Sequence, residues 1–289
     1  MFMRNKKWSL LFVGAVLVLG SVDSRAEQKQ VTAEKAMNQS NAVTEGLKTL
    51  QVGEVKITWI QDNAGEKLMP RGLFADASDE LIDSLALQQG VPSSIGVFWM
   101  ETQGTGILFD TGMGGASGHM LTGLRALGVQ PEEVKYLYIT HFHGDHIGGM
   151  LENGRAVFPN AQVYVSRVEY EAWMKLPAEQ NVQVVETMKA YQDRLHLFEF
   201  GDQLPGGVKA MDASGHTPGH TVFQAGRVLV IADLIHGAAL QLEHPEICAS
   251  FDMDKKAAVA VRRHFLQYAK ENGLTLAGMH LPAPGFKAW

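Results

Sequence analysis

The segment THFHGDHIGGM, residues 140–150, constrains this chain more than any other feature of its sequence. It places three histidines and one aspartate between His141 and His146 and ends in paired glycines. The residues that lead into it, VKYLYIT at 134–140, have the apolar pattern of a strand. Loops at strand ends are where a rigid sheet presents functional groups. The segment therefore predicts a sheet that carries a site on a short loop.

The four polar side chains of this loop have the types and spacing of metal ligands. His141 and His143, two residues apart on an extended turn, can face one ion, while Asp145 and His146 are offset enough to reach a second. Imidazole and carboxylate together suit zinc and its first-row neighbours. A histidine-rich turn can also be plain polar surface, but the glycines around these residues provide the backbone freedom that a tight coordinating loop needs. We therefore predict a metal site.

One loop would leave each ion with too few ligands, and later strand ends offer more. ASGHTPGH at 213–220 supplies His216 and His220, VLVIADLIH at 228–236 supplies Asp233, and AGMHLP at 277–282 supplies His280. An aspartate after a run of buried apolar residues is costly unless it is paired or bound to metal. Asp233 is therefore more than a chance carboxylate.

The rest of the chain alternates between strand and helix patterns, which predicts two sheets packed together with helices outside. The expected strands are 53–60, a pair across a tight turn at 94–112, 134–140, 161–166, 195–200, 208–213, 221–225, 227–233 and 274–280. The expected helices are 79–90, 117–128, 167–174, 182–194 and 254–272, the last with an apolar face through Ala258, Val261, Phe265 and Ala269.

The N-terminus has the layout of a secretory signal peptide. Basic residues precede a short apolar run from Trp8 to Val22, and Ser24-Arg25-Ala26 follows as a small-residue cleavage site. An uncleaved anchor is the alternative, but the run is short and contains glycines. We expect cleavage after Ala26, a periplasmic or secreted product without stable membrane insertion, a polar leader at 27–51 and one folded domain at 52–289.

Charge and cysteine content narrow the class of protein further. The net charge is −6, and residues 1–26 contain four basic residues and one acidic residue, so the remainder carries about −9. A chain this acidic is a poor candidate for binding nucleic acid. Cys248 is the single cysteine, so no intrachain disulfide forms, and we expect a buried, inert thiol.

Five motifs together resemble a known family. HFHGDH is similar to the HxHxDH signature of the metallo-β-lactamase fold, and FDTG (109–112), GHTPGH (215–220), IAD (231–233) and GMH (278–280) resemble its other motifs in their expected order. The resemblance covers roughly residues 52–286. The sections around Trp173, Asp233 and His280 look most like exported members of the methyl parathion hydrolase type, and more distantly like acyl-homoserine lactonases. Such proteins usually continue beyond Phe286 with a further strand or hairpin, whereas this chain ends at Trp289.

The resemblance implies an α+β fold, a four-layer αβ/βα sandwich, with two divalent metal ions that we expect to be zinc. It assigns His141, His143 and His216 to one ion and Asp145, His146 and His280 to the other, with Asp233 between them. It also implies that Asp110 orients a ligand histidine by hydrogen bonding, although a turn aspartate is an alternative, and that His220 supports its loop.

The implied chemistry is hydrolysis by a hydroxide shared between the two ions, with Asp145 orienting it and passing a proton to the leaving group. Lactones, carboxylic esters and phosphotriesters are all compatible small-molecule substrates. A β-lactam-hydrolysing enzyme is the second hypothesis, although such enzymes usually have cysteine or serine in place of Asp233. A member that binds metal or ligand without turnover is the third.

Fewer features describe the substrate pocket and the assembly. Trp173 could line an apolar pocket or belong to the core, with Phe74 and Phe98 as weaker pocket candidates. His236 could face the pocket or hold a structural hydrogen bond. We expect solvated positions for His119, His196, His244 and His264, and a homodimer is the default assembly.

Overall fold

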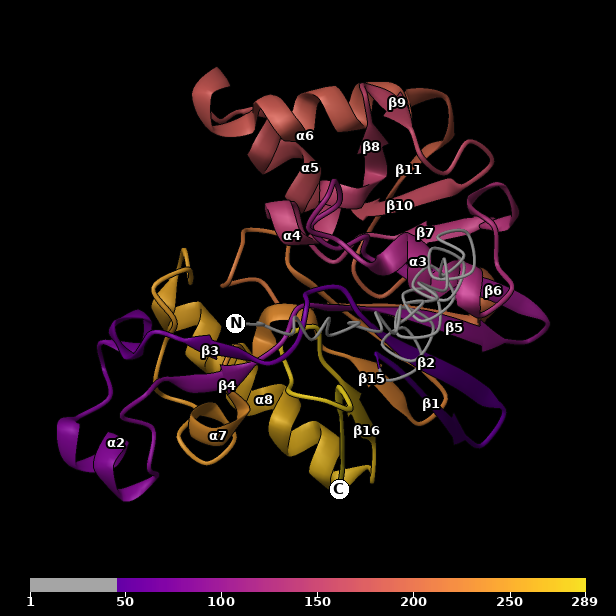
Figure 1. Ribbon diagram of the computed structural model, residues 1–289. Helices are drawn as coiled ribbons and strands as arrows, with labels where there is room; N and C mark the ends of the chain where they lie inside the picture. Colours follow the sequence, from indigo (N-terminus) through magenta and orange to yellow (C-terminus); the bar gives the residue numbers. More distant parts are fainter. Residues whose placement is uncertain (1–45) are drawn as a thin grey trace, which may run out of the picture. The chain divides into compact units, whose positions relative to one another are not determined.

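The computed structural model describes residues 46–289, which contain two large sheets packed face to face (Figure 1). The expected signal peptide and the first part of the expected leader, residues 27–45, lie outside the described residues. The sandwich predicted from the sequence pattern is confirmed, and its strands and helices interleave along the chain.

The first large sheet has seven strands in the order β1-β2-β5-β6-β7-β10-β11. Its first four strands pair antiparallel, and β6, β7, β10 and β11 continue in parallel. The strands are β1 (Leu47–Val52), β2 (Val55–Gln61), β5 (Gly96–Thr102), β6 (Thr105–Phe109), β7 (Tyr136–Tyr138), β10 (Gln162–Ser166) and β11 (Leu195–Phe198).

The second large sheet has six strands in the order β12-β13-β14-β15-β16-β17, all antiparallel except the β15–β16 pair. These strands are β12 (Gln203–Leu204), β13 (Val208–Asp212), β14 (Thr221–Ala225), β15 (Val228–Val230), β16 (Thr275–Ala277) and β17 (Phe286–Ala288). Two small hairpin sheets complete the strand list: β3 (Lys67–Met69) with β4 (Val91–Ser93), and β8 (Leu151–Glu152) with β9 (Arg155–Ala156).

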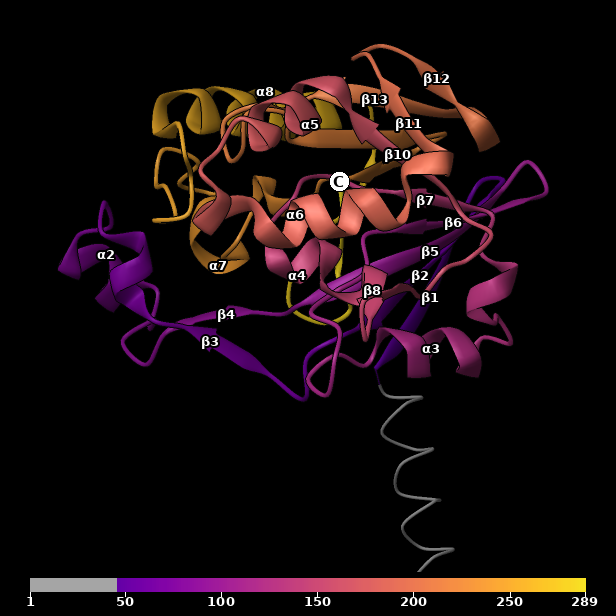
Figure 2. The same cartoon turned by 90° about the horizontal axis from the view of Figure 1, so that it is seen from above.

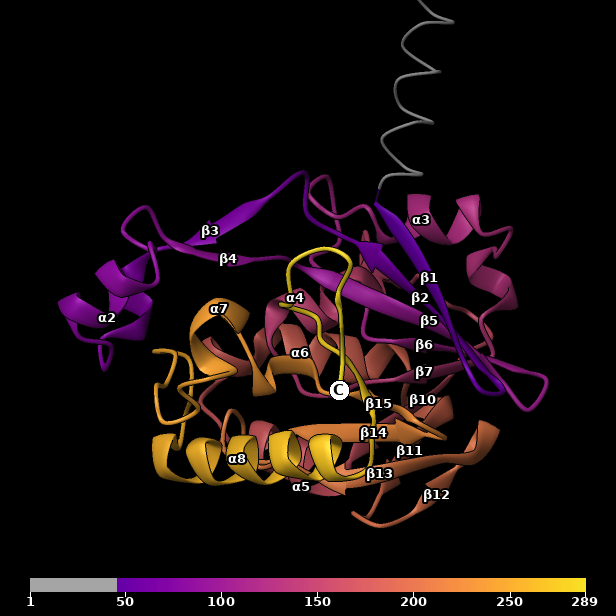
Figure 3. The ribbon, with the colours of Figure 1, turned by 90° about the horizontal axis from the view of Figure 1, so that it is seen from below.

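Helices lie on the outer faces of both sheets, which gives the four layers of an αβ/βα sandwich (Figures 2 and 3). The helices are α2 (Asp79–Ser84), α3 (Met120–Ala126), α4 (Gly144–Ile147), α5 (Arg167–Met174), α6 (Ala178–Ala190), α7 (Ala238–Gln241) and α8 (Lys255–Glu271). Short 3-10 turns connect them: η1 (Arg71–Phe74), η2 (Pro131–Glu133), η3 (Gly148–Met150), η4 (Gln192–Arg194), η5 (Pro205–Gly207) and η6 (Ala232–Leu234).

The central core lies between the two sheets and is rich in aromatic rings. The Phe223 ring centroid is 5.5 Å from that of Phe109, 5.6 Å from Tyr138 and 5.8 Å from Phe198. Separate apolar clusters fill the outer faces, where α3, α5 and α6 cover the seven-stranded sheet and α8 covers the six-stranded sheet. These contacts fix the sheets against each other and so fix the strand ends that carry the predicted ligands.

Several expectations need correction. The folded domain begins before Val52, because residues 47–51 belong to β1 and pair antiparallel with β2; none of the β1 side chains is fully buried, so the segment looks like a polar leader. Helix α6 begins at Ala178 rather than Val182, directly after Pro177. The two weaker pocket candidates are core residues: Phe74 packs with the β3–β4 arm, and Phe98 lies between the sheets.

The expected burial of Cys248 and the expected exposure of three of the four histidines outside the motifs agree with the structure. Cys248 is buried, and His119, His196 and His264 are exposed while His244 is half-buried. Within residues 46–289, no helix has both the length and the apolar character needed to cross a membrane.

The aromatic core gives a direct test of the sandwich. We expect Phe223→Ala to lower the free energy of unfolding by about 3–5 kcal/mol, because it removes a ring from a closely packed interior. Val182→Ala on the surface of α6, where the side chain is 55% exposed, serves as the control and should change it by less than about 0.5 kcal/mol. Urea denaturation measures both, and equal losses would contradict the placement of Phe223.

Candidate metal centre

Strand ends from both large sheets meet at one place and carry the predicted ligands. The loop with His141, His143, Asp145 and His146 follows β7 of the seven-stranded sheet. In the six-stranded sheet, His216 follows β13, Asp233 follows β15 and His280 follows β16. A hydrogen bond from the Thr221 N–H to the Thr140 carbonyl, 3.0 Å long, joins the two sets of loops. All seven side chains lie in two neighbouring groups.

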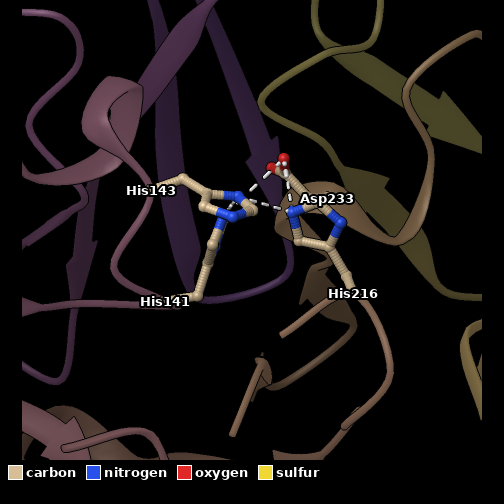
Figure 4. A group of neighbouring side chains, drawn as sticks. All are labelled: His141, His143, His216 and Asp233. Atoms are coloured by element: carbon tan, nitrogen blue, oxygen red, sulfur yellow. Dashed lines mark hydrogen bonds and ion pairs between the residues drawn. The ribbon is translucent and has the colours of Figure 1, made fainter. Parts of the chain in front are cut away.

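The first group contains His141, His143, His216 and Asp233 (Figure 4). Each of them offers one possible metal-ligand atom, and these four atoms lie within 4.8 Å of one another. His143 Nδ1 lies 3.1 Å from His141 Nε2 and 2.9 Å from His216 Nε2. Asp233 Oδ2 lies 3.3 Å from His216 Nε2 and 3.8 Å from His141 Nε2. Three imidazoles and one carboxylate oxygen therefore converge.

The second group contains Asp145, His146 and His280, and Asp233 contacts it as well. His146 Nε2 lies 3.0 Å from Asp233 Oδ1 and 3.8 Å from Asp145 Oδ1. His280 Nε2 lies 3.1 Å from Asp233 Oδ2 and 3.6 Å from Asp145 Oδ2. Of the two carboxylates in these groups, Asp233 is thus the one that contacts histidines of both.

Hydrogen bonds to Nδ1 fix the orientation of three of these rings. His146 Nδ1 donates to Asp110 Oδ2 over 2.7 Å, and His280 Nδ1 donates to the Ser94 carbonyl over 2.8 Å. His141 Nδ1 lies 3.0 Å from Thr140 Oγ1, which itself donates to Asp110 Oδ2 over 2.7 Å. In each bond Nδ1 carries the hydrogen, so Nε2 of the neutral ring has a free lone pair that points to the centre. Asp110 is therefore not a simple turn residue, because its carboxylate orients two of the rings.

The remaining predicted residues lie close to the same centre. His220 Nδ1 donates to the Ala213 carbonyl over 3.2 Å, and His220 Nε2 accepts from the Asp233 N–H over 3.2 Å. His236 is buried, with its ring stacked on His280 at 5.4 Å and its Nε2 3.2 Å from Asp233 Oδ2. Trp173 packs in the outer core with its ring nearly perpendicular to that of His143, at 5.8 Å between centroids.

Burial and charge shift the pKa values of these groups in opposite directions. Burial favours the neutral form of Asp233, but His146, His280 and His141 outweigh it and hold the pKa of Asp233 well below its usual range. Burial likewise opposes protonation of His216, yet Asp233 and then Asp252 raise its pKa to about 9. At His143 burial has the largest effect and the neighbouring His216 adds to it, so the pKa falls to about 4. At neutral pH, protons would therefore compete with a metal ion for ring nitrogen atoms of the centre, above all at His216.

The donor set fits a metal ion. His146 Nε2 and Asp233 Oδ1 are buried and lie 3.0 Å apart, but neither forms a well-aligned hydrogen bond within the described part of the chain, which is costly for polar atoms. In the first group, ring nitrogens face each other at 2.9 and 3.1 Å. Zinc bound tetrahedrally at 2.0–2.1 Å separates neighbouring nitrogens by about 3.3 Å, so an ion of this size suits the group.

Two of the seven side chains are accessible to solvent. Five of the seven side chains are buried, whereas His143 and Asp145 are half-buried. The Asp145 side chain keeps 29% of its surface exposed. These two residues therefore form the accessible part of the centre.

Glu169 contributes to the site in a way that the sequence pattern did not reveal. It is fully buried on α5, and its Oε1 accepts from the Phe142 N–H over 3.0 Å. Its Oε2 accepts from the Thr217 hydroxyl over 2.9 Å and from the Gly219 N–H over 2.8 Å. One carboxylate thus ties the loop of His141 and His143 to the loop of His216. Its position within a helix of mixed polarity gives no local signal of this role.

Comparison with known proteins places the chain in a family. Residues 90–278 match the Metallo-beta-lactamase superfamily, and the chain belongs to it. An N-acyl homoserine lactonase from Bacillus cereus is 27% identical over 146 residues, which are 43% of this chain and 54% of that protein. Another from a Bacillus species is 32% identical over 97 residues, 34% of this chain and 35% of that protein. The matches thus span about a third to a half of these relatives.

Solved structures match over more of the chain. The hydrolase AbOPH, of the beta lactamase superfamily, has a TM-score of 0.74 and 33% identity, covering 84% of this chain and 92% of its own. AidC, a dizinc quorum-quenching lactonase in complex with a product, also has a TM-score of 0.74, with 27% identity and coverage of 84% and 93%. The fold predicted from the five motifs, the metallo-β-lactamase fold, is confirmed.

The supporting role of Glu169 can be tested by replacing one of its carboxylate oxygens, a hydrogen-bond acceptor, with an amide group, a hydrogen-bond donor. We expect Glu169→Gln to lower the free energy of unfolding by about 2–3 kcal/mol, because the amide cannot accept all three hydrogen bonds and leaves a buried donor unpaired. The matched control is Glu171→Gln, an exposed glutamate on the same helix. Chemical denaturation measures both variants, and indistinguishable stabilities would remove Glu169 from the support of the site.

Competition between protons and metal predicts a pH dependence. A ligand imidazole must be neutral, so an ion has to displace the proton that the raised pKa of about 9 retains on His216 in the metal-free protein. The apparent affinity for zinc should therefore rise with pH up to about 9, about tenfold per pH unit for each displaced proton. Calorimetric titration of metal-free protein in buffers of different ionisation enthalpy measures proton release. A pH-independent affinity would contradict this electrostatic arrangement.

Proposed function

We propose that this protein is a metal-dependent hydrolase that binds two divalent ions, which we expect to be zinc, and cleaves an ester-like bond. The observation that carries the proposal is the position of Asp233. Its Oδ1 lies 3.0 Å from His146 Nε2, while its Oδ2 lies 3.3 Å from His216 Nε2. One buried carboxylate between two groups of imidazoles is the arrangement that a pair of ions requires.

The first ion would be held by His141, His143 and His216, the second by Asp145, His146 and His280, and Asp233 would serve both. Bound ions at such a site polarise a carbonyl or phosphoryl oxygen and lower the pKa of a water molecule toward neutrality. The chain has no serine or cysteine among these seven side chains, so the nucleophile comes from water rather than from the protein.

Asp145 is the residue that we assign to proton transfer. It is the partly exposed carboxylate of the centre, and His146 and His280 lower its pKa against the effect of burial. It is therefore ionised at neutral pH and can accept a proton at a carboxylate oxygen. It can then deliver that proton to the departing alkoxide, the leaving group that an ester or lactone produces.

Apolar side chains flank the centre and favour a substrate with an apolar part. Trp173 lies beside His143, and Phe251, which is 42% exposed, lies beside His236 at 5.7 Å. The relatives described as N-acyl homoserine lactonases, together with the dizinc lactonase AidC, make a lactone the first substrate to test. Carboxylic esters and phosphotriesters present the same kind of electrophilic centre next to an alkoxide leaving group and come next.

A substrate panel tests the proposal. Purified protein loaded with zinc should hydrolyse at least one of an acyl-homoserine lactone, a nitrophenyl ester and a phosphotriester, and should lose the activity when a chelator removes the metal. A chromogenic β-lactam belongs in the same panel. Turnover of the β-lactam alone would replace our proposal with β-lactamase activity, and protein that holds about two ions but hydrolyses none of the four compounds would overturn the proposed activity.

A variant of Asp145 tests its assigned role in the same assay. We expect Asp145→Asn to lower kcat by about 10²–10⁴-fold, since the amide cannot carry the proton. Metal analysis of the variant shows how much of the loss comes from weaker binding of the ions. Asp193→Asn, at an exposed position, is the control and should leave kcat unchanged. A metal-loaded Asp145→Asn variant with full activity would remove Asp145 from the reaction.

A further inference from the structure

His216 makes a second contact, with a residue that lies outside all of the ligand motifs. While its Nε2 faces the first group of ligands, its Nδ1 donates to Asp252 Oδ1 over 3.1 Å. The Asp252 side chain is fully buried and belongs to the segment between α7 and α8. His216 is thus oriented by a carboxylate 36 residues away in the sequence.

Asp252 is in turn held by Arg262, an arginine buried to 1% exposure on the inner side of α8. Arg262 Nη2 donates to Asp252 Oδ2 over 2.9 Å. Arg262 Nε donates to the carbonyl of Leu234 over 2.7 Å, directly after Asp233 in the chain. Nη1 completes the set with the carbonyls of Pro245 and Ile247, at 2.9 and 3.1 Å. One guanidinium therefore binds the supports of two ligands, His216 and Asp233.

Backbone contacts bind the same segment to the His216 loop. The Met253 N–H donates to the His216 carbonyl over 3.1 Å, and the Asp254 N–H donates to the Gly215 carbonyl over 2.8 Å. Gly215 lies against the start of α8, where an added Cβ would be 2.3 Å from the Ala258 nitrogen. The loop that carries His216 is thus seated directly on the N-terminal end of α8.

Stability alone is a weak reason for this arrangement. Two charges removed from water have a large desolvation cost, and replacing a buried ion pair with apolar residues is often neutral or stabilising. The pair is instead placed where it can fix the direction of a ligand ring. Outer partners of metal ligands have this role in many metal sites, and losing one typically weakens metal binding 10–100-fold.

We propose that Asp252 and Arg262 form a positioning relay, in which Arg262 fixes Asp252, and Asp252 fixes the ring and the tautomer of His216. Through Leu234, the same arginine also fixes the backbone beside Asp233. The inference rests on the proposed metal function, and it makes α8 a support for the first group of ligands.

The test measures metal binding directly in the full chain. Asp252→Ala should weaken the binding of one zinc ion about 10–100-fold in competition with a chromogenic chelator, while the other ion binds as in the wild type. With cobalt as the probe, the visible absorption spectrum of the variant should change, because the His216 ring is no longer fixed. Asp252→Asn keeps an oxygen that can accept from Nδ1 and should recover part of the lost affinity.

A double variant separates positioning from folding. Arg262→Met leaves Asp252 buried without its counter-ion and should lower the melting temperature, and adding Asp252→Ala should recover part of that loss. The defect in metal affinity should persist in the double variant. Arg263→Met is the matched control, since this neighbouring arginine is exposed and pairs only at 3.4 Å with Glu246.

The outcomes distinguish the relay from the proposed function. If wild-type protein binds two ions and Asp252→Ala binds both with unchanged affinity and cobalt spectrum, the relay is overturned while the metal centre stands. The relay is also overturned if the affinity defect of Asp252→Ala disappears in the double variant together with the stability loss. Wild-type protein that binds no zinc or cobalt would overturn both proposals.

Discussion

The buried carboxylate of Asp233 is the constraint on which the rest of the structure depends. It follows β15, a strand in which every residue is buried, and at this position an isolated charge would be prohibitively costly. The imidazoles of both groups surround it and lower its pKa. Rings among these must in turn be oriented by hydrogen bonds. Asp110, Ser94 and Asp252 accept those bonds, so the elements that carry them also support the site. Much of the sandwich around the site can be understood as support for this one group.

Features encoded within a short segment could be predicted from the sequence. The loop at 141–146 follows a strand and has its ligands at fixed spacing, and α5 and α8 show clear periodicity, so their positions could be predicted closely. Edge strand β1 could not, because it buries no side chain fully and lacks the alternation that marks a strand. Apolar spacing alone predicts too late a start for α6, because Ala178 is the one apolar residue in its first turn at 178–181. Pro177 marks the start instead, since proline is common at helix starts.

The supports of the ligands depend on long-range packing and therefore could not be derived from local pattern. Glu169 contacts Phe142 and Gly219, residues 27 and 50 positions away. Arg262 did carry a signal, since it lies between Ala258 and Phe265 on the predicted apolar face of α8. A charge on a buried helix face conflicts with the binary pattern, and such conflicts concentrate at functional sites.

The division of the ligands between the sheets has a consequence for the architecture as a whole. The seven-stranded sheet brings His141, His143, Asp145 and His146, and the six-stranded sheet brings His216, Asp233 and His280. Neither half of the chain holds a complete set for either group, so the centre exists only where the two halves dock. The centre therefore forms only at the interface between the sheets. Bound ions would contact ligands from both sheets and hold the two sheets together at this edge.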